Sequence, residues 1–155
     1  MTKPRLALLL AAGLAAAALA GCSAGGGAAL SSGLTQRMDA PGASLNRAEA
    51  LGIVNHFRAT SGSSQLTADA SLDATAQSLA AAYAQSGTAP KSPAGAAGMR
   101  TSAGYPNFAE TFSGWRNSPE DAAVLNERGA SKAGIGVAYD PKSTYGVYWV
   151  LLLGN

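Results

Sequence analysis

Cysteine and histidine are almost absent from this chain of 155 residues, which contains only Cys22 and His56. A single cysteine excludes an intrachain disulfide and a zinc site with several cysteine ligands. A single histidine excludes a metal site with several imidazole ligands from one chain. A serine triad would need His56, which is expected on a partly exposed helix surface. We therefore expect no resident metal and no other cofactor.

Charged residues are also scarce, at 13% of the chain, and their signs nearly balance. Lys and Arg number 11 and Asp and Glu number 9, but Lys3 and Arg5 lie within the first five residues. Without these two the count is 9 against 9, so the rest of the chain is neutral. Nucleic-acid binding needs clustered Lys and Arg that neutralise phosphates, so we expect no nucleic-acid partner.

The N-terminal residues have the pattern of an export signal. Lys3 and Arg5 precede an uninterrupted apolar run over residues 6–20. At 15 residues this run is shorter than the ~20 that a membrane-spanning helix needs. Its length and its basic flank are typical of a secretory signal peptide.

The end of this run resembles the bacterial lipobox, whose cysteine is lipidated and becomes the mature N-terminus. The motif here is Leu19-Ala20-Gly21-Cys22. We predict a lipoprotein signal peptide over residues 1–21 and a lipid anchor on Cys22 that holds the chain at a membrane. By analogy with known sorting rules, Ser23 favours the outer membrane, with the domain facing the periplasm. A plain signal peptide with an incidental cysteine is the alternative.

A flexible tether and one folded domain are expected after the signal. Residues 22–43 are small and polar, with several Gly and Ser, and show no sustained apolar period. All aromatic residues lie between Phe57 and Trp149. We therefore place the folded domain at residues 44–155, a length sufficient for one modest core.

Helix signals come first in this domain and strand signals last. Ser44 is expected to cap a helix that stops near residues 60–62, and a second helix begins near Asp69 and ends at Gly87. Its apolar stripe consists of Leu72, Ala76, Leu79 and Tyr83. A Ser-Pro pair at 118–119 predicts a third helix that runs to about Arg128.

The remaining segments predict strands and a short turn. A helical turn is expected at Met99 and Arg100, and a strand at residues 108–113. Residues 133–139 and 145–153 both alternate in polarity around a turn-rich loop, so a terminal antiparallel hairpin is expected. Helices followed by strands indicate an α+β fold rather than a doubly wound sheet.

Several short motifs follow one another in an informative order. They are Asn55-His56-Phe57-Arg58, Leu66-Thr67-Ala68-Asp69, Met99-Arg100, Ala103-Gly104-Tyr105, Ala109-Glu110, Trp115-Arg116-Asn117-Ser118-Pro119, Gly134-Ile135-Gly136 and Tyr148-Trp149. In this order they resemble the CAP superfamily (cysteine-rich secretory, antigen 5 and pathogenesis-related proteins), in its short bacterial form. The resemblance covers about residues 45–153.

This resemblance implies an α-β-α sandwich, with a central antiparallel sheet flanked by helices. It also implies a cleft in which two histidines and two glutamates can hold a divalent metal. Only Glu110 matches one of those four residues. The loop Lys91-Ser92-Pro93 has no histidine, and Glu120-Asp121 stands where the second histidine is expected after Ser118-Pro119.

Glu110 is therefore the one candidate catalytic residue, and we assign no definite catalytic role to any residue. The candidate ligand-binding residues are Tyr105, Glu110, Trp115 and Asp121. Two alternatives remain open: Glu110 serves structure alone, held by backbone N–H groups, Arg100 or Arg116, and Trp115 belongs to the core.

The expected function is non-catalytic binding by a membrane-anchored envelope lipoprotein. Its ligand would be a lipid, a cell-wall component such as peptidoglycan, or a protein. One alternative is a residual hydrolase that uses Glu110 with Glu120 and Asp121, since three carboxylates suit a hard cation. The other is a purely structural envelope lipoprotein.

Overall fold

A computed structural model describes residues 30–155 of the chain. The predicted signal peptide and Cys22 lie outside the described residues. The centre of the molecule is a four-stranded sheet in the order β1-β3-β4-β2. Its strands are β1 (Thr67–Ala68), β2 (Gly98–Ala103), β3 (Lys132–Tyr139) and β4 (Val147–Gly154). All neighbours pair antiparallel except β1, which runs parallel to β3.

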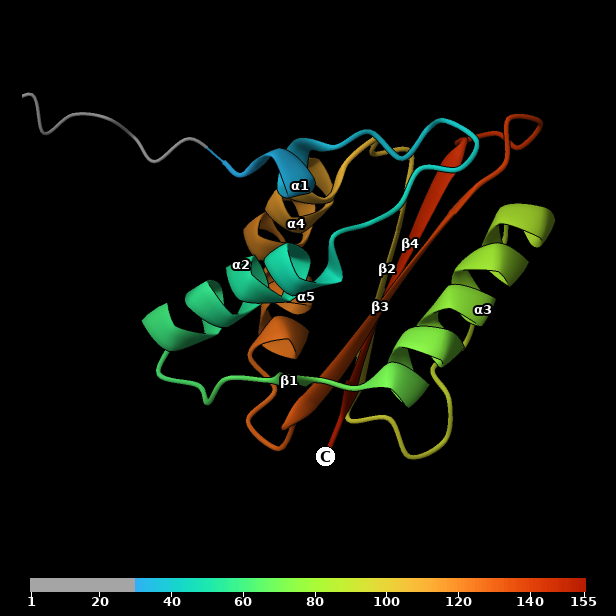
Figure 1. The fold of residues 1–155 in the computed structure, drawn as a ribbon. Coiled ribbons are helices and arrows are strands. Elements are labelled where there is room, and N and C mark those ends of the chain that lie inside the picture. The colour runs from blue at the N-terminus through green and yellow to red at the C-terminus, as the bar shows by residue number, and fades with distance from the viewer. Residues whose placement is uncertain (1–29) are drawn as a thin grey trace, which may run out of the picture.

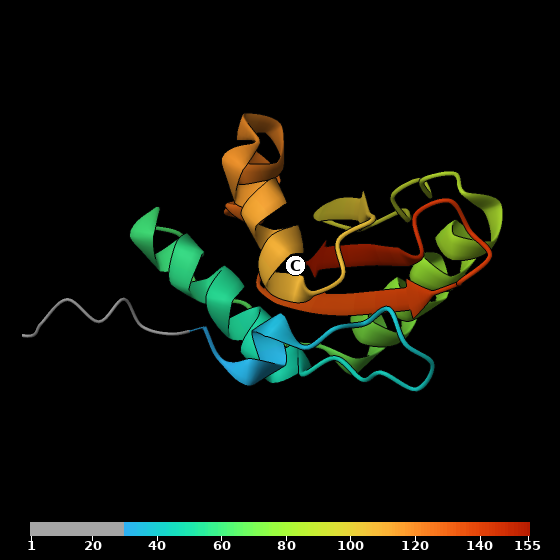
Figure 2. The same ribbon diagram turned by 90° about the horizontal axis from the view of Figure 1, so that it is seen from above.

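Helices cover both faces of this sheet, as Figures 1 and 2 show. They are α1 (Ser32–Thr35), α2 (Arg47–Thr60), α3 (Ala70–Ser86), α4 (Phe108–Asn117) and α5 (Pro119–Leu125). Helix α3 lies alone on one face, and the other helices gather on the opposite side. The predicted α+β sandwich is therefore confirmed, and so is the terminal antiparallel hairpin of β3 and β4.

Helix α3 packs unusually close to strand β3. A Cβ atom at Gly134 would overlap the backbone of Leu72, and one at Gly136 would overlap the backbone of Ala76. The two glycines therefore let the helix backbone touch the strand backbone. The close approach explains why small side chains, Ala76 and Ala80, are fully buried on this face.

The opposite face holds a larger core made of aromatic and branched side chains. Phe108 is fully buried, with its ring centroid 5.7 Å from that of Trp149 and 6.1 Å from that of Trp115. Strand β4 contributes Leu151 and Leu153 to the same cluster. Burial of such side chains stabilises each by roughly 1.5–3 kcal/mol relative to exposure.

Two polar residues of α2 fix the surrounding loops. Asn55 exchanges two hydrogen bonds with the backbone of Leu66, at 2.8 and 2.9 Å. Arg58 is fully buried and donates to carbonyls of four residues, Ser64, Leu125, Glu127 and Ala130. Burial lowers the pKa of Arg58, as expected for a cation removed from water. The Asn-x-x-Arg motif therefore has a structural role in this chain.

Four sequence predictions of local structure are wrong. Helix α2 begins at Arg47 and is capped by Asn46, not by Ser44. Residues 108–113, predicted as a strand, begin helix α4, because Asn107 caps the first turn and the segment buries one helical face of aromatics. Met99 and Arg100 are part of β2 rather than a helical turn, because they pair with Leu152 and Leu151 of β4. Helix α5 ends at Leu125 rather than near Arg128. The Arg58 guanidinium donates a hydrogen bond to the Leu125 carbonyl at this end.

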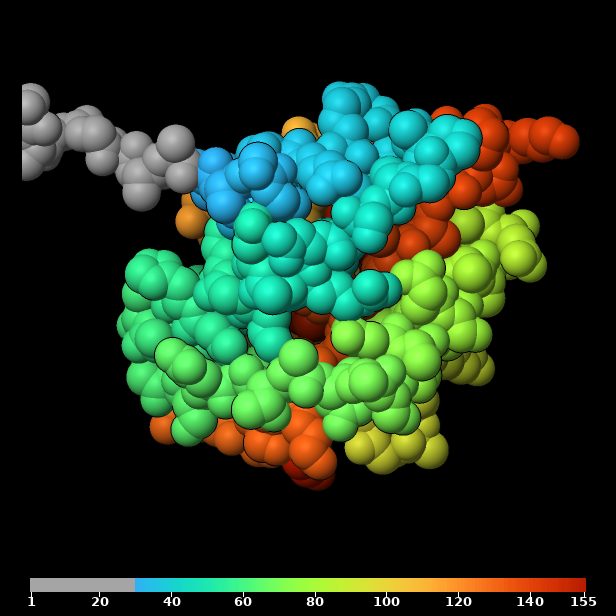
Figure 3. Space-filling view, viewed as in Figure 1, coloured from blue at the N-terminus to red at the C-terminus, as the bar shows by residue number. Residues whose placement is uncertain are grey.

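Residues 30–43, expected to belong to the tether, instead pack on the domain, and we call them the N-terminal strap. Leu34 and Met38 of the strap are buried at 7% and 2% exposure. The backbone N–H of Met38 donates to the carbonyl of Pro106 at 2.7 Å. Figure 3 shows the strap, blue to cyan, running along the upper side of the molecule towards the β3–β4 hairpin.

Candidate functional site

Two of the four predicted ligand-binding residues line one shallow surface pocket. Tyr105 and Glu110 border a depression of about 290 Å³ together with Ser113, Gly114 and Asn117 of α4. We call it the Glu110 pocket. It combines an aromatic ring, a carboxylate, a hydroxyl and an amide within one short stretch of chain.

Glu110 is fixed by a reciprocal cap at the start of α4. Its backbone N–H donates to Asn107 Oδ1 at 2.9 Å, and Asn107 Nδ2 donates to Glu110 Oε1 at 2.7 Å. The first of these bonds satisfies a backbone N–H at the helix N-terminus, and the second joins the two side chains. The cap uses one carboxylate oxygen of Glu110 and orients the group beside the pocket.

Tyr105 lies against α4 because residue 114 has no side chain. A Cβ atom at Gly114 would come within 3.2 Å of the Tyr105 hydroxyl and 3.3 Å of its ring. The ring is 39% exposed, and the carbonyl of Tyr105 accepts a hydrogen bond from Trp149 at 2.9 Å. The aromatic wall of the pocket is therefore held by the core beneath it.

A positively charged residue of the strap lies near this pocket. Arg37 pairs with Asp39, and this hydrogen bond raises the pKa of the Arg37 guanidinium above its ordinary value. The nearby Glu110 carboxylate raises it slightly further. The same pairing lowers the pKa of Asp39. Because Arg37 is paired with Asp39, the two side chains together carry no net charge.

The other two predicted site residues lie elsewhere. Trp115 is only 2% exposed and packs in the core, where its indole N–H donates to the Thr101 carbonyl at 3.1 Å. Asp121 accepts from Arg100 at 2.6 Å, and their side chains are 29% and 28% exposed. The family resemblance made them candidates beside Glu110, but α4 buries Trp115 and Asp121 belongs to the next helix, α5.

No convergent metal centre forms among residues 30–155. Glu120 and Asp121 occupy the first turn of α5, with Ser118 as its cap. Within this part of the chain, no group of three or more His, Cys, Asp and Glu side chains is placed to hold a metal ion. His56 is exposed on α2. No helix among the described residues combines the length and apolarity that a membrane span requires.

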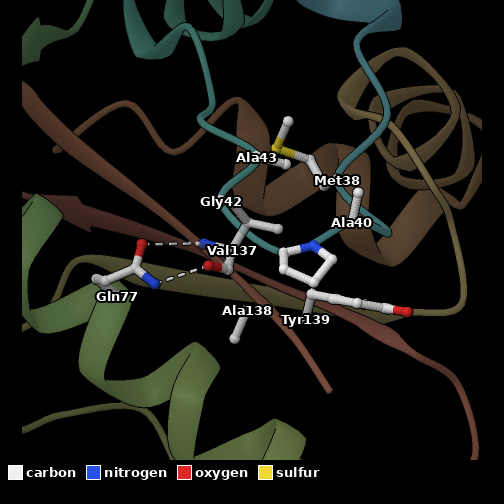
Figure 4. Close-up of a pocket in the computed structure, with 9 residues that line it drawn as sticks. Met38, Ala40, Gly42, Ala43, Gln77, Val137, Ala138 and Tyr139 are labelled. Atoms are coloured by element: carbon white, nitrogen blue, oxygen red, sulfur yellow. Dashed lines mark hydrogen bonds between the residues drawn. The ribbon is translucent and has the colours of Figure 1, made fainter. Parts of the chain in front are cut away.

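Two further pockets lie near the end of the sheet where β3 ends and β4 begins. One, of about 240 Å³, separates strap residues 38–43 from the end of β3 (Figure 4). There the Gln77 side chain pairs with the backbone of Val137, donating to its carbonyl at 2.7 Å. The other pocket, of about 230 Å³, lies between the end of α3 and the β3–β4 loop.

A family model described as the cysteine-rich secretory protein family, CAP, matches residues 51–153. The chain belongs to the CAP family. The match leaves the N-terminal strap outside the shared region. No curated protein sequence matches the chain significantly.

Solved CAP structures have a similar fold at low sequence identity. An outer surface protein from Borrelia burgdorferi is 20% identical with a TM-score of 0.53, over 68% of this chain and 88% of that one. MpPR-1i is 19% identical with a TM-score of 0.54, over 70% and 84%. A cysteine-rich secretory protein from Staphylococcus aureus is 12% identical with a TM-score of 0.52, over 70% of this chain and 38% of its own.

Sequence reasoning missed three residues of the Glu110 pocket, namely Ser113, Gly114 and Asn117. It treated the segment as a strand, so positions three and four residues apart were not placed on one surface. The spacing Asn107-x-x-Glu110 was the available sign of a helix start.

Proposed function

We propose that this CAP protein is an envelope lipoprotein that binds cell-wall glycan, without cleaving it, at the Glu110 pocket. The lipid on Cys22 would hold it at the outer membrane, with the domain in the periplasm. The observation that carries the proposal is the pairing of the exposed Tyr105 ring with the oriented Glu110 carboxylate in one pocket.

The chemistry of the pocket lining supports a saccharide ligand. The apolar face of a sugar ring can pack against a tyrosine ring, which offers apolar area with a polar tip. A carboxylate, an amide and a hydroxyl from Glu110, Asn117 and Ser113 can then pair with sugar hydroxyl and amide groups. A small number of placed polar groups is what gives such sites specificity.

The arrangement of carboxylates supports binding rather than hydrolysis. Glycosidases generally flank the scissile bond with two carboxyl groups. Glu110 is the one carboxylate among the described residues that line this pocket. Asp121, the alternative partner, is engaged by Arg100 at 2.6 Å.

The proposed anchor is supported by the lipobox-like sequence before Cys22 and by the envelope location named for one relative of similar fold, the Borrelia outer surface protein. Membrane fractionation of a Cys22→Ala variant tests the anchor. We expect the variant in the soluble fraction and the unaltered protein in the membrane fraction. Retention of the variant at the membrane would contradict the lipid anchor.

Sedimentation with purified peptidoglycan tests the ligand. Glu110→Gln keeps the size of the side chain and an acceptor for Asn107 but removes the charge, so we expect about tenfold weaker binding, as for loss of a charge-assisted hydrogen bond. Glu120→Gln makes the same change on the exposed start of α5 and should leave binding unaltered. Equal binding by both variants would contradict the proposed site.

A further inference from the structure

The five tyrosines of the chain all lie at one end of the described domain, and we call this region the tyrosine end. Strand β2 ends and β4 begins here, with Ala103 opposite Tyr148, and β3 ends at Tyr139, opposite Val147. The other three are Tyr83 near the end of α3, Tyr105 after β2 and Tyr145 before β4.

Tyr145 lies between the Glu110 pocket and the rest of this cluster. Its ring lies 3.7 Å from the position that a Cβ at Gly104 would take, next to Tyr105. The centroid of the Tyr145 ring is 6.3 Å from that of Tyr148, which is 4.8 Å from that of Tyr83. Tyrosines therefore continue from the Glu110 pocket to the end of α3.

The exposure of two of these rings is unusual for this protein. Tyr105 is 39% exposed and Tyr145 is 56% exposed. Among residues 30–155, the one other large hydrophobic side chain with comparable exposure is Leu30, at the start of the strap. Neighbouring exposed aromatic rings mark an interaction surface more specifically than scattered ones do.

The pocket between the end of α3 and the β3–β4 loop, which Tyr148 also lines, is mostly polar. Asp140, Lys142, Ser143 and Thr144 of the β3–β4 loop face the last turn of α3 across about 230 Å³. We call it the hairpin pocket. Its residues resemble those of the Glu110 pocket in kind, since both combine a carboxylate and a hydroxyl beside a tyrosine.

Internal hydrogen bonds hold the loop of the hairpin pocket in place. The backbone N–H of Lys142 donates to the Asp140 carboxylate at 2.9 Å, and the Ser143 hydroxyl donates to the Asp140 carbonyl at 2.7 Å. Gly146 in turn donates to the Ser143 hydroxyl at 3.1 Å. An ordered loop loses less entropy on binding, which favours a preformed site.

From this arrangement we infer that the Glu110 pocket and the hairpin pocket are two ends of one site for an extended glycan strand, with Tyr145 packing against sugars between them. The inference rests on the proposed function. It adds that the ligand is an extended strand and that the hairpin pocket binds part of it. The ligand class is a neutral or N-acetylated polysaccharide, whose ring faces match the exposed Tyr105 and Tyr145 rings and whose hydroxyl groups match the polar side chains of the two pockets.

The charge of the surface favours this ligand over an anionic lipid surface. Two carboxylates, Glu110 and Asp140, line the two pockets, against one cation, Lys142. The net charge of these three groups is −1. Binding to anionic headgroups would need an excess of Lys and Arg instead.

Calorimetric titration with N-acetylglucosamine oligomers of two and six sugars tests the inference. We expect the six-sugar probe to bind at least tenfold more tightly. Tyr145→Ala should weaken the six-sugar probe about five- to tenfold, as expected when one stacking contact is lost, and leave the two-sugar probe unchanged. Leu30→Ala removes an exposed side chain that lines neither pocket and should change neither affinity.

The outcomes separate this inference from the proposed function. Glu110-dependent binding without any effect of oligomer length or of Tyr145→Ala would overturn the extended site and leave the proposed function standing. Failure of both oligomers and of purified peptidoglycan to bind would overturn both. Tyr145-dependent binding to anionic lipid vesicles, with no binding to either oligomer, would assign the surface to a membrane and overturn the inference.

Discussion

The two faces of the sheet are packed by different means. On the α3 face, the backbones of helix and strand touch at Gly134 and Gly136, and the fully buried side chains of the helix are the alanines Ala76 and Ala80. On the opposite face, large side chains such as Phe108 and Trp149 fill the space between the sheet and several helices. The α3 face is therefore sensitive to substitutions that enlarge a side chain, and the opposite face is sensitive to substitutions that shorten one.

The largest effect is expected from shortening a side chain on the aromatic face. Phe108 is fully buried between Trp115, Phe112 and Trp149. Phe108→Ala should lower the free energy of unfolding by about 3–5 kcal/mol, through lost burial and the cavity left behind. Urea denaturation measures it. A loss below about 1 kcal/mol would show that this face is not the main core.

Enlarging a residue on the α3 face should have the next largest effect. Gly136→Ala would force α3 away from β3, at a cost of about 1–3 kcal/mol. Gly52→Ala is the matched control, because no atom lies within 4 Å of a Cβ there and α2 gains helix propensity. Thermal denaturation should show a lower Tm for the first and an equal or higher Tm for the second. A Gly136→Ala protein as stable as the control would refute the close packing.

A smaller effect is expected where α3 meets the free edge of β3. The Gln77 side chain pairs with both backbone groups of Val137, at 2.7 Å to the carbonyl. Gln77→Ala leaves these groups to water, so we expect a loss of about 1 kcal/mol in unfolding free energy. The amide proton of Val137 should also exchange faster with solvent. Unchanged exchange would mean that Gln77 does not protect this edge.

The smallest effect is a pH dependence carried by Tyr83 on α3. Partial burial raises the pKa of its phenol above the ordinary 10.0. Because the folded protein holds this proton more tightly, its contribution to stability is complete below pH 10 and is lost as pH rises through the folded value. Tyr83→Phe cannot ionise, so its Tm should fall less between pH 9 and 11. Identical profiles for both proteins would contradict this assignment.

The comparison also explains which features the sequence could predict. The α3 face follows local patterns: the stripe of Leu72, Ala76 and Leu79, the cap at Asp69, and the stop at Gly87 in a left-handed conformation. The aromatic face depends on contacts distant in sequence. Residues 108–113 pack against α2 and β4, which no local window contains, and the one local sign of a helix there was the Asn107-x-x-Glu110 spacing.

The candidate site shows the same division. Tyr105 and Glu110 were identified through a family resemblance and lie together because they are close in sequence. The position of Asp121 depends on the turn between α4 and α5, which the sequence did not predict. In the structure Asp121 pairs with Arg100. The packing of the strap depends on Leu34 and Met38, two isolated apolar residues that carry no period.

Amide chemical-shift mapping of the protein with the six-sugar N-acetylglucosamine oligomer tests the proposed glycan-binding site most directly. We predict perturbations concentrated at residues 105–117 and 140–148, on either side of Tyr145. Perturbations centred on Arg100 and Asp121, or none above those given by a monosaccharide, would contradict it.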